Sequence, residues 1–69
     1  MIGRDSAVDP SVKYKDWAIV GKSADIERGV EIERSILWDN VKVKQGIRII
    51  DSIVTSNKRI ERDLVNEIY

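Results

Sequence analysis

The side chains that could do chemistry here are carboxylates, hydroxyls and guanidinium groups, because the 69-residue sequence contains no histidine and no cysteine. Ser35 and Ser52 therefore have no imidazole to act as a base, and no thiolate or imidazole metal site can form. The pairs Asp39-Asn40 and Asp51-Ser52 carry oxygens that bind cations, but their spacing is not that of an EF-hand loop. We therefore predict no catalytic, cofactor-binding or metal-binding residues in this chain.

The charged residues leave one alternative open. Neighbouring carboxylates can act as an acid/base pair, but we expect these acidic side chains to lie at turns and on solvated outer positions. The alternative function is a regulatory or ligand-binding protein that holds a small anion, such as a sugar phosphate, near Arg34, Arg48 and Arg59. Twelve basic and twelve acidic residues cancel, so no net field attracts nucleic acid or an anionic membrane.

The sequence shows no targeting segment. No apolar run approaches the roughly 20 residues of a membrane span, and the chain does not open with a signal-peptide pattern. The default expectation is a cytoplasmic protein. A chain of 69 residues is close to the lower size limit for a stable single core, and stacked repeats or assembly with other chains are two ways to supply the missing burial.

Large hydrophobic residues recur every five or six positions along the whole chain. Neither α-helical spacing nor strand alternation fits this period over the full length. We predict that these residues form the structural core: Ile2, Val8, Tyr14, Val20, Ile26, Ile32, Leu37, Val43, Ile49, Val54, Ile60 and Val65.

A second pattern accompanies the first. Three residues after each predicted core residue from Ile2 to Ile60 the sequence carries Gly, Asn, Asp or Ser, with Trp17 as the exception. These residue types favour tight turns. Four residues after each core residue stands a small or apolar residue, with Lys58 as the clear exception. Each unit therefore predicts a short strand that bends about every six residues, and three units close one triangular coil of about 18 residues.

The charges support the same stacking. Residues 17 or 18 positions apart lie above one another in such a stack, which aligns Asp16 with Arg34 and then with Asp51. Opposite-sign neighbours outnumber like-sign neighbours in this register. Each exposed pair is worth only roughly 0–1 kcal/mol, but a slip of one residue would turn the aliphatic set outward. The excess of favourable pairs therefore favours this register.

Together these patterns predict an all-β fold, a single-stranded left-handed parallel β-helix of hexapeptide repeats with nearly four coils. Residues 1–69 would form one domain. The repeat starts at Ile2 with no capping segment before it, so Ile2 and Val8 would leave an aliphatic layer open. Solenoids normally cap their ends. We therefore expect either a piece or short relative of a larger protein, or a partner that covers this edge.

Segments 33–41 (ERSILWDNV) and 49–54 (IIDSIV) closely resemble the carboxy-terminal left-handed β-helix of sugar nucleotidyltransferases. That family includes mannose-1-phosphate guanylyltransferase and the glucose-1-phosphate thymidylyl- and adenylyltransferases. It transfers a nucleotidyl group from a nucleoside triphosphate to a sugar 1-phosphate, which yields a nucleotide sugar and pyrophosphate, on an α/β domain with a glycine-rich phosphate loop. This sequence has no such loop. The resemblance therefore implies a structural or oligomerisation module that is not catalytic by itself.

Other hexapeptide-repeat proteins are acyltransferases or zinc enzymes similar to carbonic anhydrase. By resemblance, the first kind uses a histidine base and the second needs histidines to hold zinc. Because this chain has no histidine, both activities are excluded.

Three hydrophobic residues are expected to point outward. Trp38 follows Leu37 and should lie on the outer face above Gly21, Ile50 should point outward from an adjoining face, and Trp17 should sit at a corner. Tryptophan is enriched at interface hot spots, so Trp17, Trp38 and Ile50 are the candidate interface residues. The expected partners are further copies of the chain, in a dimer or trimer, and an amino-terminal catalytic domain outside this sequence.

Overall fold

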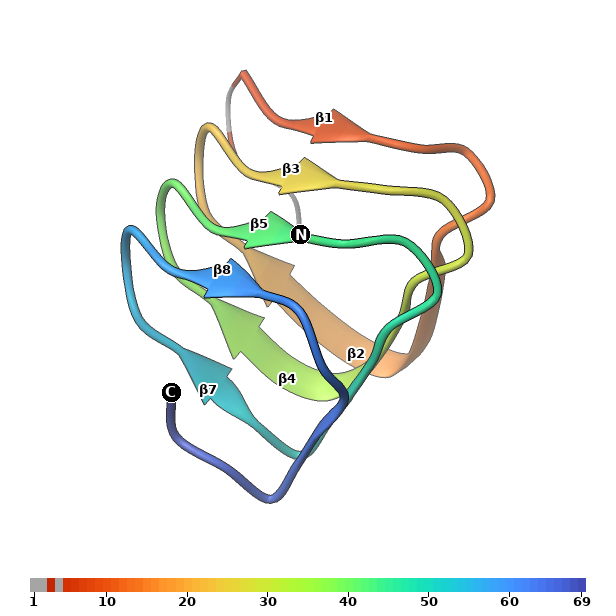
Figure 1. The fold of residues 1–69 in the computed structure, drawn as a ribbon, viewed down its shortest axis with the longest axis vertical. Helices are drawn as coiled ribbons and strands as arrows, with labels where there is room; N and C mark the ends of the chain where they lie inside the picture. Colours follow the sequence, from red (N-terminus) through yellow and green to blue (C-terminus); the bar gives the residue numbers. More distant parts are fainter. Residues whose placement is uncertain (1–2, 4) are drawn as a thin grey trace.

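A computed structural model describes residues 3 and 5–69, which form short β-strands connected by tight turns (Figure 1). The described residues contain no α-helix, and none of their segments is a helix able to cross a membrane. The strands are β1 (Ala7–Val8), β2 (Lys13–Val20), β3 (Asp25–Ile26), β4 (Glu31–Leu37), β5 (Lys42–Val43), β6 (Arg48–Ile50), β7 (Ile53–Val54), β8 (Arg59–Ile60) and β9 (Leu64–Val65).

The strands stack as the faces of a parallel β-solenoid. One face has the order β1-β3-β5-β8, and the second has the order β2-β4-β6-β9. Strands β2 and β4 bend around a corner, so that their carboxyl-terminal halves and β7 make a third face. All these pairings are parallel. The expected single-stranded parallel β-helix is therefore confirmed.

The number of coils differs slightly from the expectation. The chain makes about three turns, where the sequence pattern predicted nearly four coils. The last turn is shortened, because Leu64 pairs with Ile49 only 15 residues earlier, whereas Ile49 pairs with Ile32 at a separation of 17. Below we call each level of the stack a tier.

Backbone conformation explains the corners. Asp5, Ser23, Asn40 and Asn57 stack at one corner, each with a positive φ. These residue types tolerate the left-handed region better than most. At a second corner Gly29 and Gly46 both have a φ of 74°, a conformation that costs glycine nothing. Most of the predicted turn formers therefore stand where the chain turns.

The third corner departs from the prediction by one residue. Its positive-φ positions are Asp16, Arg34, Asp51 and Asn66, and not the predicted Ser35 and Ser52. Both serines point into the solenoid and are buried. The Ser35 hydroxyl donates to the carbonyl oxygen of Glu33 at 2.8 Å and accepts from the backbone N–H of Ser52 at 3.1 Å. The buried hydroxyls thus satisfy the backbone around a turn that is one residue shorter.

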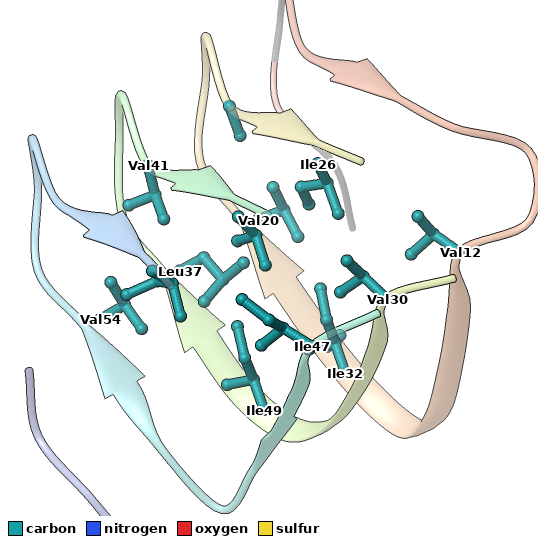
Figure 2. Close-up of a cluster of buried hydrophobic side chains, with 14 of the residues drawn as sticks. Val12, Val20, Ile26, Val30, Ile32, Leu37, Val41, Ile47, Ile49 and Val54 are labelled. Carbon is teal, nitrogen blue, oxygen red and sulfur yellow. The ribbon is translucent and has the colours of Figure 1, made fainter. Parts of the chain in front are cut away.

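The core fills the inside of the triangular coil (Figure 2). Side chains from all three faces meet there, so that each tier covers the next with aliphatic surface. Eight of the predicted core residues are buried and at most 2% exposed: Val20, Ile26, Ile32, Leu37, Val43, Ile49, Val54 and Ile60. Val8 is partly buried and packs against them. Further buried residues come from the accompanying small or apolar series: Val12, Ala18, Ala24, Val30, Val41, Ile47 and Leu64.

Three predicted core residues need separate comment. Ile2 lies outside the described residues. Tyr14 pairs with Ile32 and shares its inward column, but it is 39% exposed because it belongs to the first tier. Val65 was wrongly predicted to be buried. It is 51% exposed, and its neighbour Leu64 fills the core position in the shortened last turn.

Lys58, the polar exception in the accompanying series, lies in the last tier. The backbone N–H of Lys42 bonds to its carbonyl oxygen, which places Lys58 in the same inward column as Val41. Its ammonium nitrogen lies 5.9 Å from the centre of the Tyr69 ring, and the guanidinium carbon of Arg62 lies 5.8 Å from the same ring. A lysine stem can cover apolar surface while its charged end stays in water. Lys58 is therefore compatible with its column at this tier.

Candidate functional site

The most unusual surface of the described molecule is the outer side of the third face. Ile19, Ile36, Ile53 and Ile68 follow one another in register across four tiers. Ile19, Ile36 and Ile53 each stand between two buried residues, so strand alternation turns them outward. Ile68 pairs with Ile53 and is 80% exposed. Ile36 is half-buried by its neighbours, and the other three are exposed. The result is a continuous row of isoleucine side chains in contact with water, which we call the isoleucine row.

Two tryptophans flank this row. Trp17 lies at the corner where β2 bends, at a shift in the pairing register, and is 48% exposed. Trp38 directly follows β4 at the opposite edge and is 51% exposed. Scattered surface hydrophobes are ordinary, but a contiguous apolar surface marks an interaction site. We call the isoleucine row together with Trp17 and Trp38 the apolar face.

A shallow groove runs along the Trp38 edge of the apolar face. Its volume is about 350 Å³, and it is lined by Ile19, Gly21, Ile36, Leu37, Trp38, Asp39 and Ser56. Gly21 has no side chain to fill it. The backbone of Gly21 lies directly against the next tier, where its N–H donates to the carbonyl oxygen of Leu37 at 2.7 Å. The groove therefore has a floor of tightly packed backbone and largely apolar walls.

The structure places the predicted interface residues on two different faces. Trp17 and Trp38 lie at the two edges of the apolar face, as their positions in the repeat implied. Ile50 pairs with Glu33 and Val65 on the neighbouring face and is half-buried. The isoleucine row was missed, because the sequence pattern placed Ile36 and Ile53 in the accompanying small or apolar series. The spacing of the predicted core residues shortens from six to five at Leu37 and at Val54. These two short steps could have identified the row, because they turn the preceding residues, Ile36 and Ile53, outward.

The corner beside Trp17 carries a ladder of charges. The Arg34 guanidinium donates to both carboxylate oxygens of Asp51, at 2.6 and 3.1 Å, to Asp16 at 3.0 Å and to Glu33 at 2.7 Å. These bonds hold the pKa of the Asp51 carboxyl below its usual value and raise the pKa of Arg34. The predicted alignment of Asp16, Arg34 and Asp51 is thus seen as a set of ion pairs.

This ladder makes stability depend on pH. Because Arg34 lowers the pKa of Asp51 in the folded state, the ionised carboxylate stabilises the fold above the unfolded pKa of about 4, and that contribution is lost as the pH falls through the folded value. We expect Asp51→Asn to lower the melting temperature at pH 7 and to flatten its decline between about pH 5 and pH 3. Asparagine suits the turn, since Asn66 occupies the same corner with a positive φ.

Thermal unfolding followed by circular dichroism across this pH range measures the effect. The control is Asp5→Asn, a change of the same type at another corner residue with a positive φ. A decline with acid that is equally steep in Asp51→Asn and in the unmodified protein would contradict the role of the ladder.

The three arginines of the anion-binding alternative do not come together. Arg34 is already bonded to three carboxylates. Arg48 lies in β6 and Arg59 in β8, on different faces. A hollow beside Arg59 is lined by Lys42 and Lys44, but also by Asp25 and Glu27, whose charges oppose an anion. Arg34, Arg48 and Arg59 therefore do not form the single cluster that this alternative expected.

The described residues satisfy their buried polar side chains within the fold. They contain no group of three or more metal-ligating side chains, and no buried side-chain nitrogen or oxygen lacks a hydrogen-bond partner. Ser35 and Ser52 use their hydroxyls to bond backbone atoms. The arrangement can therefore present a surface for binding, and the apolar face is the surface that stands out.

Comparisons with protein-family models, with curated proteins and with solved structures found no match to this chain. The features that bear on function are therefore the surface of the solenoid and the resemblance of segments 33–41 and 49–54.

Proposed function

We propose that this chain is a non-catalytic assembly module, a β-helix whose apolar face binds a second copy of the chain. The observation that carries the proposal is the isoleucine row flanked by Trp17 and Trp38. Burying apolar surface contributes roughly 25 cal/mol per Å², and tryptophans dominate many interfaces. No other described face combines exposed aromatic side chains with a continuous aliphatic row.

The resemblance to sugar nucleotidyltransferases extends the proposal. In a protein of that family the β-helix would hold the subunits together, and a separate α/β domain would transfer the nucleotidyl group to the sugar 1-phosphate. The chain itself would position the subunits in the assembly and would contribute no reacting group. A hexapeptide-repeat origin, a nucleotide-sugar pathway and a cytoplasmic location belong to the same proposal.

Sedimentation equilibrium over a wide concentration range tests the self-association. We expect the unmodified chain to associate reversibly, and Ile19→Asp to raise the dissociation constant at least tenfold. Ile19 is 46% exposed, so the substitution does not introduce a charge into the core. The expected loss comes from an unpaired carboxylate that must be desolvated at the interface.

Val65→Asp is the matched control, since Val65 is 51% exposed on a neighbouring face. It should leave association unchanged. A chain that stays monomeric at near-millimolar concentration would rule out the proposal, as would an equal loss of association in both variants. Circular dichroism of each variant shows whether the β-fold is retained.

A further inference from the structure

We propose that two copies pack apolar face to apolar face about a two-fold axis parallel to the β-helix axis, with Trp17 of each copy seated in the groove of the other. This inference rests on the proposed self-association and specifies its geometry. Two copies suffice because each presents one such face, and an isologous contact uses the same surface on both. The two solenoids then run in the same direction.

The direction of the strands decides which residues of the two copies face each other. In the tier formed by β2 the chain crosses the apolar face from Trp17 at one edge, through Ile19, to Gly21 at the other edge. A two-fold axis parallel to the β-helix axis places each tier opposite the same tier of the second copy and exchanges the two edges. Trp17 of one copy therefore faces Gly21 of the other, and the same contact forms a second time by symmetry.

The alternative axis runs along the strands and reverses the order of the tiers. Each edge of the apolar face would then lie opposite the same edge of the second copy. Trp17 of one copy would meet the last tier of the other, near Asn66 and Glu67. Asn66 is exposed, and the Glu67 carboxylate is already paired with Arg62 at 2.9 Å. An exposed indole gains little from such a polar surface. The parallel arrangement is therefore the one that buries both tryptophans of each copy.

The groove suits an indole. It measures about 350 Å³, has Trp38 as one wall, and lacks a side chain at Gly21. Two aromatic rings with their centres roughly 4.5–7 Å apart gain about 0.5–1.5 kcal/mol beyond the burial of area. Trp17 of the second copy would stack against Trp38 and cover Ile19 and Ile36, which contact water in the single chain.

Charge at the two edges favours the same arrangement. Asp16 stands next to Trp17 in the charge ladder, where one guanidinium, that of Arg34, meets three carboxylates, so this corner keeps a net negative charge. Lys22 stands next to Gly21 in the same tier. Exchange of the edges therefore sets the carboxylate of one copy opposite the ammonium of the other, twice per dimer. Complementary charges at the rim of an interface fix its register more than they add to its affinity.

The dimensions of the face set the expected affinity. Four residue steps of about 3.3 Å and a stack of four tiers about 4.8 Å apart give a flat area on the order of 200–300 Å². A standard interface buries about 800 Å² per partner. We therefore expect a weak, reversible dimer with a dissociation constant on the order of 100 µM.

Cross-linking distinguishes the two axes. The isoleucine row lies along the centre of the face, so the parallel arrangement sets Ile19 of one copy against Ile19 of the other. The reversed arrangement sets Ile19 against Ile68. The chain has no native cysteine, so single cysteine variants give an unambiguous readout. Packed sheets lie about 10 Å apart, beyond the usual Cα separation for a disulfide, and a short bifunctional maleimide is the suitable reagent.

We expect Ile19→Cys to form a covalent dimer at 200 µM or above, about the concentration that a weak interface requires. Lys42→Cys, an exposed position on the face formed by β1, β3, β5 and β8, is the control and should remain uncross-linked. Adding Trp17→Ala to Ile19→Cys should reduce the yield at least fivefold. Circular dichroism establishes that each variant is folded.

Three outcomes would overturn the arrangement. A cross-link that requires a mixture of Ile19→Cys and Ile68→Cys would show the reversed axis, and self-association through the apolar face would still stand. A dimer in the ultracentrifuge without any cross-link at Ile19 would show that another surface is used. Monomers in the ultracentrifuge would remove both this arrangement and the proposed function.

Discussion

Leu64→Asp is expected to prevent the chain from folding, whereas Val65→Asp should leave a folded protein. Leu64 is fully buried and pairs with Ile49 in the inward column, while Val65 is 51% exposed. A carboxylate without a partner is very costly in such a site. A chain of this length has a total stability of roughly 3–10 kcal/mol, so one such substitution is enough to remove the folded state.

Circular dichroism and urea denaturation of the two variants measure this difference. The pair is well matched, because the residues are adjacent, both aliphatic, and changed to the same side chain. A folded Leu64→Asp, or an unfolded Val65→Asp, would show that the last turn keeps the five- or six-residue period seen in the sequence. The shortened turn described here would then be wrong.

Gly21→Ala is expected to destabilise the protein by about 2–3 kcal/mol, as overpacking does in a close-packed interior. A Cβ atom at Gly21 would lie 2.7 Å from the carbonyl carbon of Trp38 and 2.8 Å from the backbone nitrogen of Asp39, and it would also meet the Asp39 carboxylate. These are backbone atoms of the next tier. They cannot retreat without loss of the 2.7 Å hydrogen bond between Gly21 and Leu37.

Gly46→Ala is the control for this prediction. Nothing lies within 4 Å of an added Cβ there, so only the positive φ of 74° opposes the change. That strain costs roughly 1–2 kcal/mol. The urea midpoint should therefore fall further for Gly21→Ala than for Gly46→Ala. The reverse order would mean that the tiers separate easily at this edge, and the groove beside Trp38 would lose its rigid floor.

The period of large hydrophobic residues was sufficient to predict the fold class and most of the core. A residue such as Ile32 or Ile49 must be apolar, because the inside of a narrow solenoid has no water and no partner for a polar group. This constraint recurs once per face and is therefore visible in a single sequence. The alignment of Asp16, Arg34 and Asp51 was visible for a related reason, since stacked tiers bring these side chains within bonding distance.

The places where the period shortens were not decided by the sequence. Where two core residues are five positions apart instead of six, the repeat unit has lost one residue either before the turn or after it. Both possibilities keep Leu37 and Val54 in the core. Stacking selects the choice in which Arg34 and Asp51 turn the chain, and Ser35 and Ser52 point inward. Their hydroxyls can bond the backbone of the neighbouring tier in that position.

The apolar face is a consequence of this selection. With the serines inside, Ile36 and Ile53 must point outward, where they extend the row begun by Ile19. The same kind of choice, made in the last turn, buries Leu64 and exposes Val65. Local residue types allow either arrangement. Only the contacts between tiers, which join residues 15 to 18 positions apart, carry the energy that decides which side of each turn faces the core.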